Sequence, residues 1–93
     1  MIESFACRET EALWNGRRSR RFPGDIQSRA LQKLILLNSA TRLENLRIPP
    51  SNRLELLKGD RAGQYSIRVN DQWRICFRWT GSHAVDVAIT DYH

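Results

Sequence analysis

The sequence is poor in cysteine and has no long hydrophobic run. Its two cysteines, Cys7 and Cys76, form neither a disulfide framework nor a metal-ligand spacing, so we interpret both as reduced residues packed within strands. The longest strictly aliphatic run, Leu34–Leu37, is far too short to cross a membrane. Glu3 and Arg8 interrupt the stretch where a signal peptide would need apolar residues. We therefore expect a cytoplasmic protein without membrane contact.

Lysine is also scarce, although the chain is basic. Lys33 and Lys58 are the only lysines among 15 basic residues, which outnumber 10 acidic residues and give a net charge of +5. Arginine binds phosphate through paired hydrogen bonds and stacks on bases, so this balance favours a polyanionic partner. A basic surface kept for solubility is the alternative, because net charge alone discriminates weakly. The sequence contains no acidic cluster for catalytic metal ions, and we expect neither metal nor cofactor.

Alternating side chains predict two paired strands in the second half of the chain. Residues 64–69 and 73–79 alternate between apolar and polar side chains, which indicates half-buried strands. A three-residue loop at 70–72 aligns the apolar residues on one face, whereas a two-residue turn would mix the faces. The predicted register therefore places Arg68 directly opposite Arg74 on the polar face.

The opposed arginines have two interpretations. Like charges directly opposite each other on a sheet are unfavourable, so the pair is consistent with a site for an anion, and two guanidinium groups suit phosphate. Alternatively, Arg68 and Arg74 point into solvent or pair with Glu55 or Asp86. The sequence does not decide between these interpretations.

The remaining segments predict an α+β domain over residues 1–93. Residues 1–7 resemble a first strand, 9–15 a short helix, and Asp25 the N-cap of a main helix. Residues 41–44 have a capping-box pattern for further helical turns. The apolar stripe of the main helix consists of Ile26, Ala30, Leu31, Leu34 and Leu37. A last strand is expected to carry Val85, Val87 and Ile89 on one face. The helices should cover one face of a mainly antiparallel sheet, leaving an open polar face of the kind that binds nucleic acid.

The densest basic cluster follows the short helix. It consists of Arg17, Arg18, Arg20 and Arg21, interrupted by Ser19. One interpretation is a solvated loop. The other is a contact with a phosphate backbone, which would add affinity and salt dependence but little sequence selectivity.

Four segments in the second half closely resemble the HigB branch of the RelE-like toxins. They are Leu57-Lys58-Gly59-Asp60-Arg61, Gly63-x-Tyr65-Ser66-Ile67-Arg68-Val69-Asn70, Trp73-Arg74-Ile75 and the terminal Asp91-Tyr92-His93. The resemblance implies a compact microbial-RNase-like α+β fold and a toxin of a type II toxin–antitoxin pair. It implies metal-independent cleavage of mRNA in the A site of the 70S ribosome. It also implies inhibition by a HigA-type helix-turn-helix antitoxin, with operator DNA contacted only through that antitoxin.

The resemblance also implies site residues. Lys58 and Arg74 would supply positive charge, while Asp91, Tyr92 and His93 would form a carboxy-terminal catalytic cluster. His93 could act as acid or base, because its unperturbed pKa is about 6.5. Further contacts with RNA or the ribosome would come from Arg61, Arg68 and Gln72.

Glu55 departs from the family pattern, because several members have a histidine at this position. Three explanations remain open: Glu55 replaces the imidazole with a raised pKa, catalysis is weaker, or Glu55 pairs with an arginine. The leading hypothesis is therefore a ribosome-dependent endoribonuclease toxin. The alternative is a weakly active or non-cleaving module that binds ribosomes or RNA and acts mainly through its antitoxin complex.

Overall fold

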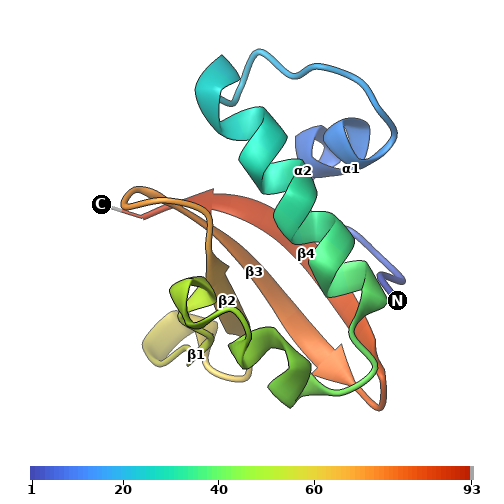
Figure 1. Ribbon diagram of the computed structural model, residues 1–93, viewed down its shortest axis with the longest axis vertical. Helices are drawn as coiled ribbons and strands as arrows, with labels where there is room; N and C mark the ends of the chain where they lie inside the picture. Colours follow the sequence, from blue (N-terminus) through green and yellow to red (C-terminus); the bar gives the residue numbers. More distant parts are fainter. Residues whose placement is uncertain (93) are drawn as a thin grey trace.

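The computed structural model describes residues 1–92 and confirms the α+β architecture. Two helices cover one face of an antiparallel sheet in the order β1-β2-β3-β4 (Figure 1). The elements are α1 (Arg8–Trp14), α2 (Gly24–Ser39), β1 (Glu55–Leu56), β2 (Tyr65–Arg68), β3 (Trp73–Thr80) and β4 (His83–Asp91). Short 3-10 helices are η1 (Leu43–Arg47), η2 (Pro50–Asn52) and η3 (Gly59–Arg61). No helix among the described residues is long and apolar enough to cross a membrane.

The predicted register of β2 and β3 is confirmed. Tyr65 lies opposite Phe77, Ile67 opposite Ile75, and Arg68 opposite Arg74. In the connecting loop, the side-chain oxygen of Asn70 accepts hydrogen bonds from the backbone N–H groups of Gln72 (2.9 Å) and Trp73 (2.7 Å). These bonds fix the three-residue loop, which in turn fixes the register. The apolar residues of both strands consequently pack under α2 in the hydrophobic core.

A bulge in β4 corrects the expected pattern of the last strand. Cys76 lies opposite Ala88 and Arg78 opposite Val85, so two residues of β4 face one residue of β3. Asp86 is the extra residue and has a left-handed backbone with φ of 53°. The bulge reverses the alternation, so Val85 does not share the buried face of Val87. Ala84 takes that place and is fully buried.

Two local predictions in the first half of the chain were wrong, and a third was confirmed only in part. Residues 1–7 form no strand and make only two isolated parallel bridges, Ile2 to Ala84 and Phe5 to Val87. Pro23, not Asp25, is the N-cap of α2, and its side chain makes no capping bond. The further helical turns predicted after residues 41–44 are present as η1, but the residue that closes the first turn is Asn45 and not Glu44. The side-chain oxygen of Asn45 accepts hydrogen bonds from the backbone N–H groups of residues 41 and 42.

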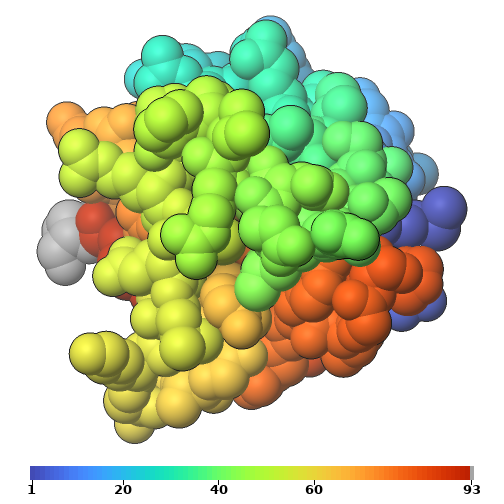
Figure 2. Space-filling model, turned by 60° about the horizontal axis from the view of Figure 1, so that its bottom comes forward, coloured from blue at the N-terminus to red at the C-terminus, as the bar shows by residue number. Residues whose placement is uncertain are grey.

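The polar face of the sheet is covered at its centre, and it is accessible to solvent only around that centre. Ser66 and Cys76, neighbours across β2 and β3, are both fully buried. Leu57 is also buried, as it enters from the segment between β1 and η3. In Figure 2 the red end of β4 lies beside the yellow-green segment around residues 50–62, which stands forward of the sheet. The expectation of an open polar face was therefore wrong at this point.

Candidate active site

Arg74 is the most firmly held polar side chain on this face. Its Nε donates to Ser66 Oγ at 2.7 Å, and its Nη2 donates to the backbone carbonyl of Arg53 at 2.7 Å. Arg53 presents that carbonyl from a left-handed backbone conformation with φ of 46°. The Arg74 side chain is only 12% exposed. The guanidinium is therefore positioned before any ligand arrives, which is what charge stabilisation in a reaction requires.

Glu55 is the carboxylate next to this guanidinium. Its Oε2 lies 3.5 Å from Arg74 Nη2, and its side chain is 60% exposed. Of the explanations for Glu55, the geometry agrees with pairing to an arginine. The ion pair is exposed on the Glu55 side, so it contributes little to stability and can open when a stronger anion binds.

Tyr92 follows β4 and lies over the same region. The guanidinium carbon of Arg61 is 6.0 Å from the centre of its ring, and the backbone N–H of Tyr92 donates to the carbonyl of Gln72. Burial raises the pKa of Tyr92, and the neighbouring Cys76 thiol raises it further, while Arg61 acts in the opposite direction. The phenol therefore keeps its proton throughout the neutral range and is available as a proton donor.

Two of the other predicted site residues, Gln72 and Asp91, lie next to Tyr92 at the end of β4. Gln72 Nε2 donates to Asp91 Oδ2 at 3.2 Å, which ties the β2–β3 loop to the end of β4. Lys58 is exposed at the N-cap of η3, and no carboxylate among residues 1–92 pairs with it. His93 lies outside the described residues. The structure thus brings Arg74, Glu55, Tyr92 and Arg61 to one face, and sequence reasoning missed the Ser66 and Arg53 contacts that hold Arg74.

Arg68 does not converge with Arg74, although the two residues are cross-strand partners. Its guanidinium pairs with Asp71 in the adjoining loop, while Arg74 is held by Ser66 and the Arg53 carbonyl. Asp86, the other proposed partner, pairs with Arg78 at 3.8 Å. The interpretation that both guanidinium groups jointly hold one phosphate is therefore not supported by their positions in the free protein.

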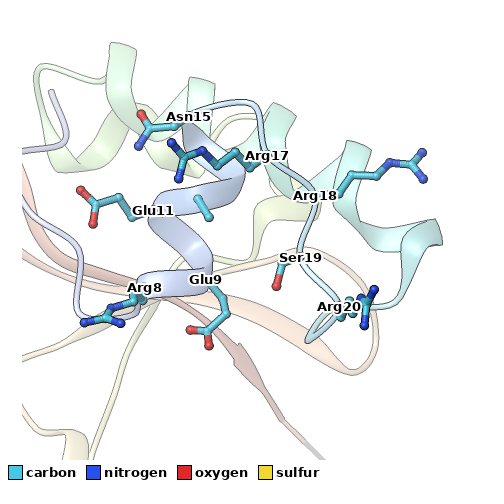
Figure 3. A pocket seen from close by; sticks show the side chains of 9 residues that line it. Arg8, Glu9, Glu11, Asn15, Arg17, Arg18, Ser19 and Arg20 are labelled. Atoms are coloured by element: carbon cyan, nitrogen blue, oxygen red, sulfur yellow. The ribbon is translucent and has the colours of Figure 1, made fainter.

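The basic cluster occupies the loop between α1 and α2 (Figure 3). Figure 3 shows Arg18 and Arg20 projecting away from α1, while Arg17 lies over that helix. The three arginines are exposed and border a pocket of about 440 Å³. Arg21 differs from them, because it lies 3.9 Å from Glu9 and borders a second cavity together with Arg61 and Asp91. Only Arg21 of the cluster therefore approaches the candidate active site.

The described residues contain no group of His, Cys, Asp and Glu side chains arranged to hold a metal ion. These residues offer one firmly held and largely covered guanidinium, one exposed ammonium, and a protonated phenol beside a second guanidinium. Such a set can bind a phosphodiester, stabilise added negative charge and donate a proton.

A family model described as "RelE-like toxin of type II toxin-antitoxin system HigB" matches residues 4–93. Toxin HigB-1 of Vibrio cholerae serotype O1 is 41% identical over 70 residues, which cover 75% of this chain and 74% of the relative. Endoribonuclease HigB of Proteus vulgaris is 31% identical over 93 residues, which cover 100% of both chains. These relatives share the length as well as the sequence pattern of this chain.

Solved structures support the fold at lower identity. A chain of the YoeB–YefM complex from Staphylococcus aureus superposes with a TM-score of 0.62 at 15% identity, covering 100% of this chain and 98% of that chain. The YoeB/ParE toxin from Agrobacterium tumefaciens superposes with a TM-score of 0.55 at 20% identity, covering 99% of each chain. The order of helices and strands is therefore shared with these toxins.

Proposed function

Because this chain belongs to the HigB-like family of RelE-like type II toxins, we propose that it is an endoribonuclease that arrests translation. We propose that it cuts mRNA in the A site of the 70S ribosome by attack of the 2′-hydroxyl, without a metal ion. The observation that carries the proposal is the Arg74 guanidinium, fixed by Ser66 and the Arg53 carbonyl on the same face as Tyr92. A related protein named Endoribonuclease HigB supports the same reaction type.

The proposed mechanism assigns charge to the cations and proton transfer to the end of the chain. Attack of the 2′-oxygen on phosphorus adds negative charge to the phosphate, which Arg74 and Lys58 would stabilise. The leaving 5′-oxygen needs a proton, which the neutral phenol of Tyr92 can supply. The 2′-hydroxyl loses its proton in the attack, and with Tyr92 as the acid the acceptor would be His93, the acid or base that the family resemblance implies. Asp91, held by Gln72, would keep this end of β4 in place.

In the proposed mechanism Glu55 would compete with the substrate for Arg74. In the free protein it neutralises Arg74 from its exposed side. An incoming phosphate would compete for the same guanidinium and displace the Glu55 carboxylate. The ion pair would then lower the apparent affinity for substrate without taking part in the reaction.

The proposed partners follow from the family. We propose that a cognate HigA-type helix-turn-helix antitoxin holds the toxin inactive, and that operator DNA is bound only through that antitoxin. The toxin would act in the cytoplasm, where its ribosomal substrate is found. Its basic loop, Arg17–Arg21, would contact ribosomal or messenger RNA through phosphates.

A second candidate function is a ribosome-binding or RNA-binding module with little cleavage. The Glu55–Arg74 ion pair favours it, because the best-positioned cation already has an anionic partner. Under this proposal the protein would occupy ribosomes and act mainly through its antitoxin complex.

Mapping of cuts on a defined mRNA separates these functions. Purified protein is added to 70S ribosomes with an empty A site and, in parallel, to the same mRNA without ribosomes, and cuts are mapped by primer extension. We expect cuts confined to A-site codons and lost in His93→Ala but retained in Arg42→Gln, whose side chain is 77% exposed. Cuts on free mRNA would instead indicate a general ribonuclease. Ribosome binding without cuts would favour the binding module.

A further inference from the structure

A second group of cations lies at the edge of β2, beyond the point where β1 stops pairing. β1 pairs only with Ser66 and Tyr65, so the end of β2 at Arg68 has β3 on one side and no strand on the other, where η2 and α2 lie nearby. A pocket of about 270 Å³ opens there. Its lining residues are Arg29, Gln32, Lys33, Ser51, Arg68 and Val69. Neither the family resemblance nor the fold required a cavity at this edge.

Lys33 is held in this pocket by a hydrogen bond to a buried side chain. Its Nζ donates to the side-chain oxygen of Asn52, which is fully buried. The Asn52 amide group in turn donates to the backbone carbonyls of Leu46 at 3.1 Å and Ile48 at 3.3 Å. Lys33 is consequently half-buried. The ammonium is therefore positioned by residues that are themselves fixed.

The pocket concentrates positive charge. Burial lowers the pKa of Lys33, and the nearby Arg29 and Arg68 lower it further. Asp71 is paired with Arg68, and no other carboxylate in residues 1–92 makes an ion pair with these three cations. Lys33 donates to Asn52 and Arg68 donates to Asp71, but both side chains carry further N–H donors that can bind an external anion. An anion that binds all three would relieve their mutual repulsion.

We propose that this pocket binds a phosphate of the RNA backbone, on a nucleotide near the phosphodiester that is cut. The proposal rests on the proposed function, because it places the pocket next to the cleavage site. Arg68 and Arg74 are directly opposed in the sheet, so their Cα atoms are about 5 Å apart. Arg68 thus connects two groups of cations, because it is the cross-strand neighbour of Arg74 and lines the pocket together with Lys33 and Arg29. A polyphosphate backbone can contact both groups, whereas a single carboxylate would contact only one of them.

The proposal is tested by binding, not by cleavage. The probe is a short RNA with 2′-O-methyl groups, which cannot be cut because the attacking hydroxyl is blocked. Its dissociation constant for the full-length protein is measured by fluorescence anisotropy over a series of salt concentrations. The variants are Arg29→Gln and the double variant Arg29→Gln/Lys33→Gln. Arg42→Gln is the control, because it removes the same charge from an exposed position outside the pocket.

We expect the slope of log K against log salt to fall by about 0.7 for each phosphate contact that is lost. The double variant should therefore show a slope smaller by about 0.7 to 1.4, and Arg42→Gln should leave the slope unchanged. Arg29 is exposed, so Arg29→Gln should keep the fold and remains informative if the Lys33 substitution unfolds the chain, which circular dichroism would reveal. Asp71→Asn should strengthen binding by removing the competing carboxylate.

Three results would overturn the proposal. The first is no binding of the probe by the wild-type protein, and the second is a slope in Arg29→Gln equal to that of Arg42→Gln. The third is an unchanged RNA slope together with lost affinity for a short polyglutamate peptide, which would make the pocket a carboxylate site for a protein partner. Because the probe cannot be cut, none of these results depends on whether the protein is a nuclease.

Discussion

Arg74 and the arginines of the loop between α1 and α2 carry the same charge in very different surroundings. Arg74 is 12% exposed and is held by Ser66 and the Arg53 carbonyl. Arg17, Arg18 and Arg20 are exposed, and within residues 1–92 none of them makes an ion pair. A fixed charge can stabilise a reaction because it needs no rearrangement, whereas mobile charges attract a polyanion from a distance. We therefore assign catalysis to Arg74 on the sheet, and the long-range attraction of RNA to the arginines of the loop.

The largest effect should follow from Arg74→Gln. Removing one fixed donor from a site that stabilises transition-state charge typically lowers the rate by about 10²- to 10³-fold. We expect a loss of that size in single-turnover cleavage on ribosomes, while the melting temperature measured by circular dichroism confirms that the variant is folded. A rate within threefold of wild type would contradict the assignment of catalysis to Arg74 on the sheet.

Tyr92→Phe should have the next largest effect. The variant removes the phenolic proton and keeps the ring near Arg61. Loss of a general acid lowers rates by about 10²-fold or more, so cleavage should fall while ribosome affinity is retained. Equal losses of affinity and rate would instead assign Tyr92 to stacking on a base.

Glu55→Gln should have an effect of the opposite sign, because it should raise the apparent substrate affinity. An exposed ion pair contributes about 0.2–1 kcal/mol, so freeing Arg74 should raise the apparent substrate affinity by about 1.4- to 5-fold. The measurement is cleavage as a function of ribosome concentration. A drop in the maximal rate of tenfold or more would show that Glu55 is the base.

The loop variant Arg17→Gln/Arg18→Gln/Arg20→Gln should have the smallest effect on the maximal rate. Loss of three phosphate contacts would reduce the salt slope of RNA binding by about 2. The fall in affinity would be largest at low salt, and the rate at saturating ribosomes would stay within about twofold. A maximal rate reduced as strongly as in Arg74→Gln would contradict the assignment.

Sequence patterns predicted the parts of this site that depend on local periodicity. The pairing of Arg68 with Arg74 followed from alternation and loop length, because a one-residue slip would expose the whole apolar face. The bulge at Asp86 was not predicted. Val85, Val87 and Ile89 alternate regularly in the sequence, and one extra residue in a strand does not change its composition in a recognisable way.

The contacts that hold the cations could not be predicted either. Arg74 reaches a carbonyl at position 53, and Lys33 reaches Asn52, through packing between elements far apart in the sequence. Roles for Tyr92 and Lys58 came from family resemblance, since a tyrosine and a lysine at such positions are ordinary surface residues by themselves.

The most direct test compares the two regions at equal loss of charge under saturating conditions. Single-turnover cleavage of A-site mRNA is measured at saturating ribosomes for Arg74→Gln and, separately, for Arg18→Gln, each of which removes one positive charge. We predict a rate lower by about 10²-fold or more for Arg74→Gln and an unchanged rate for Arg18→Gln. Equal rates for the two variants would contradict the assignment of catalysis to the sheet.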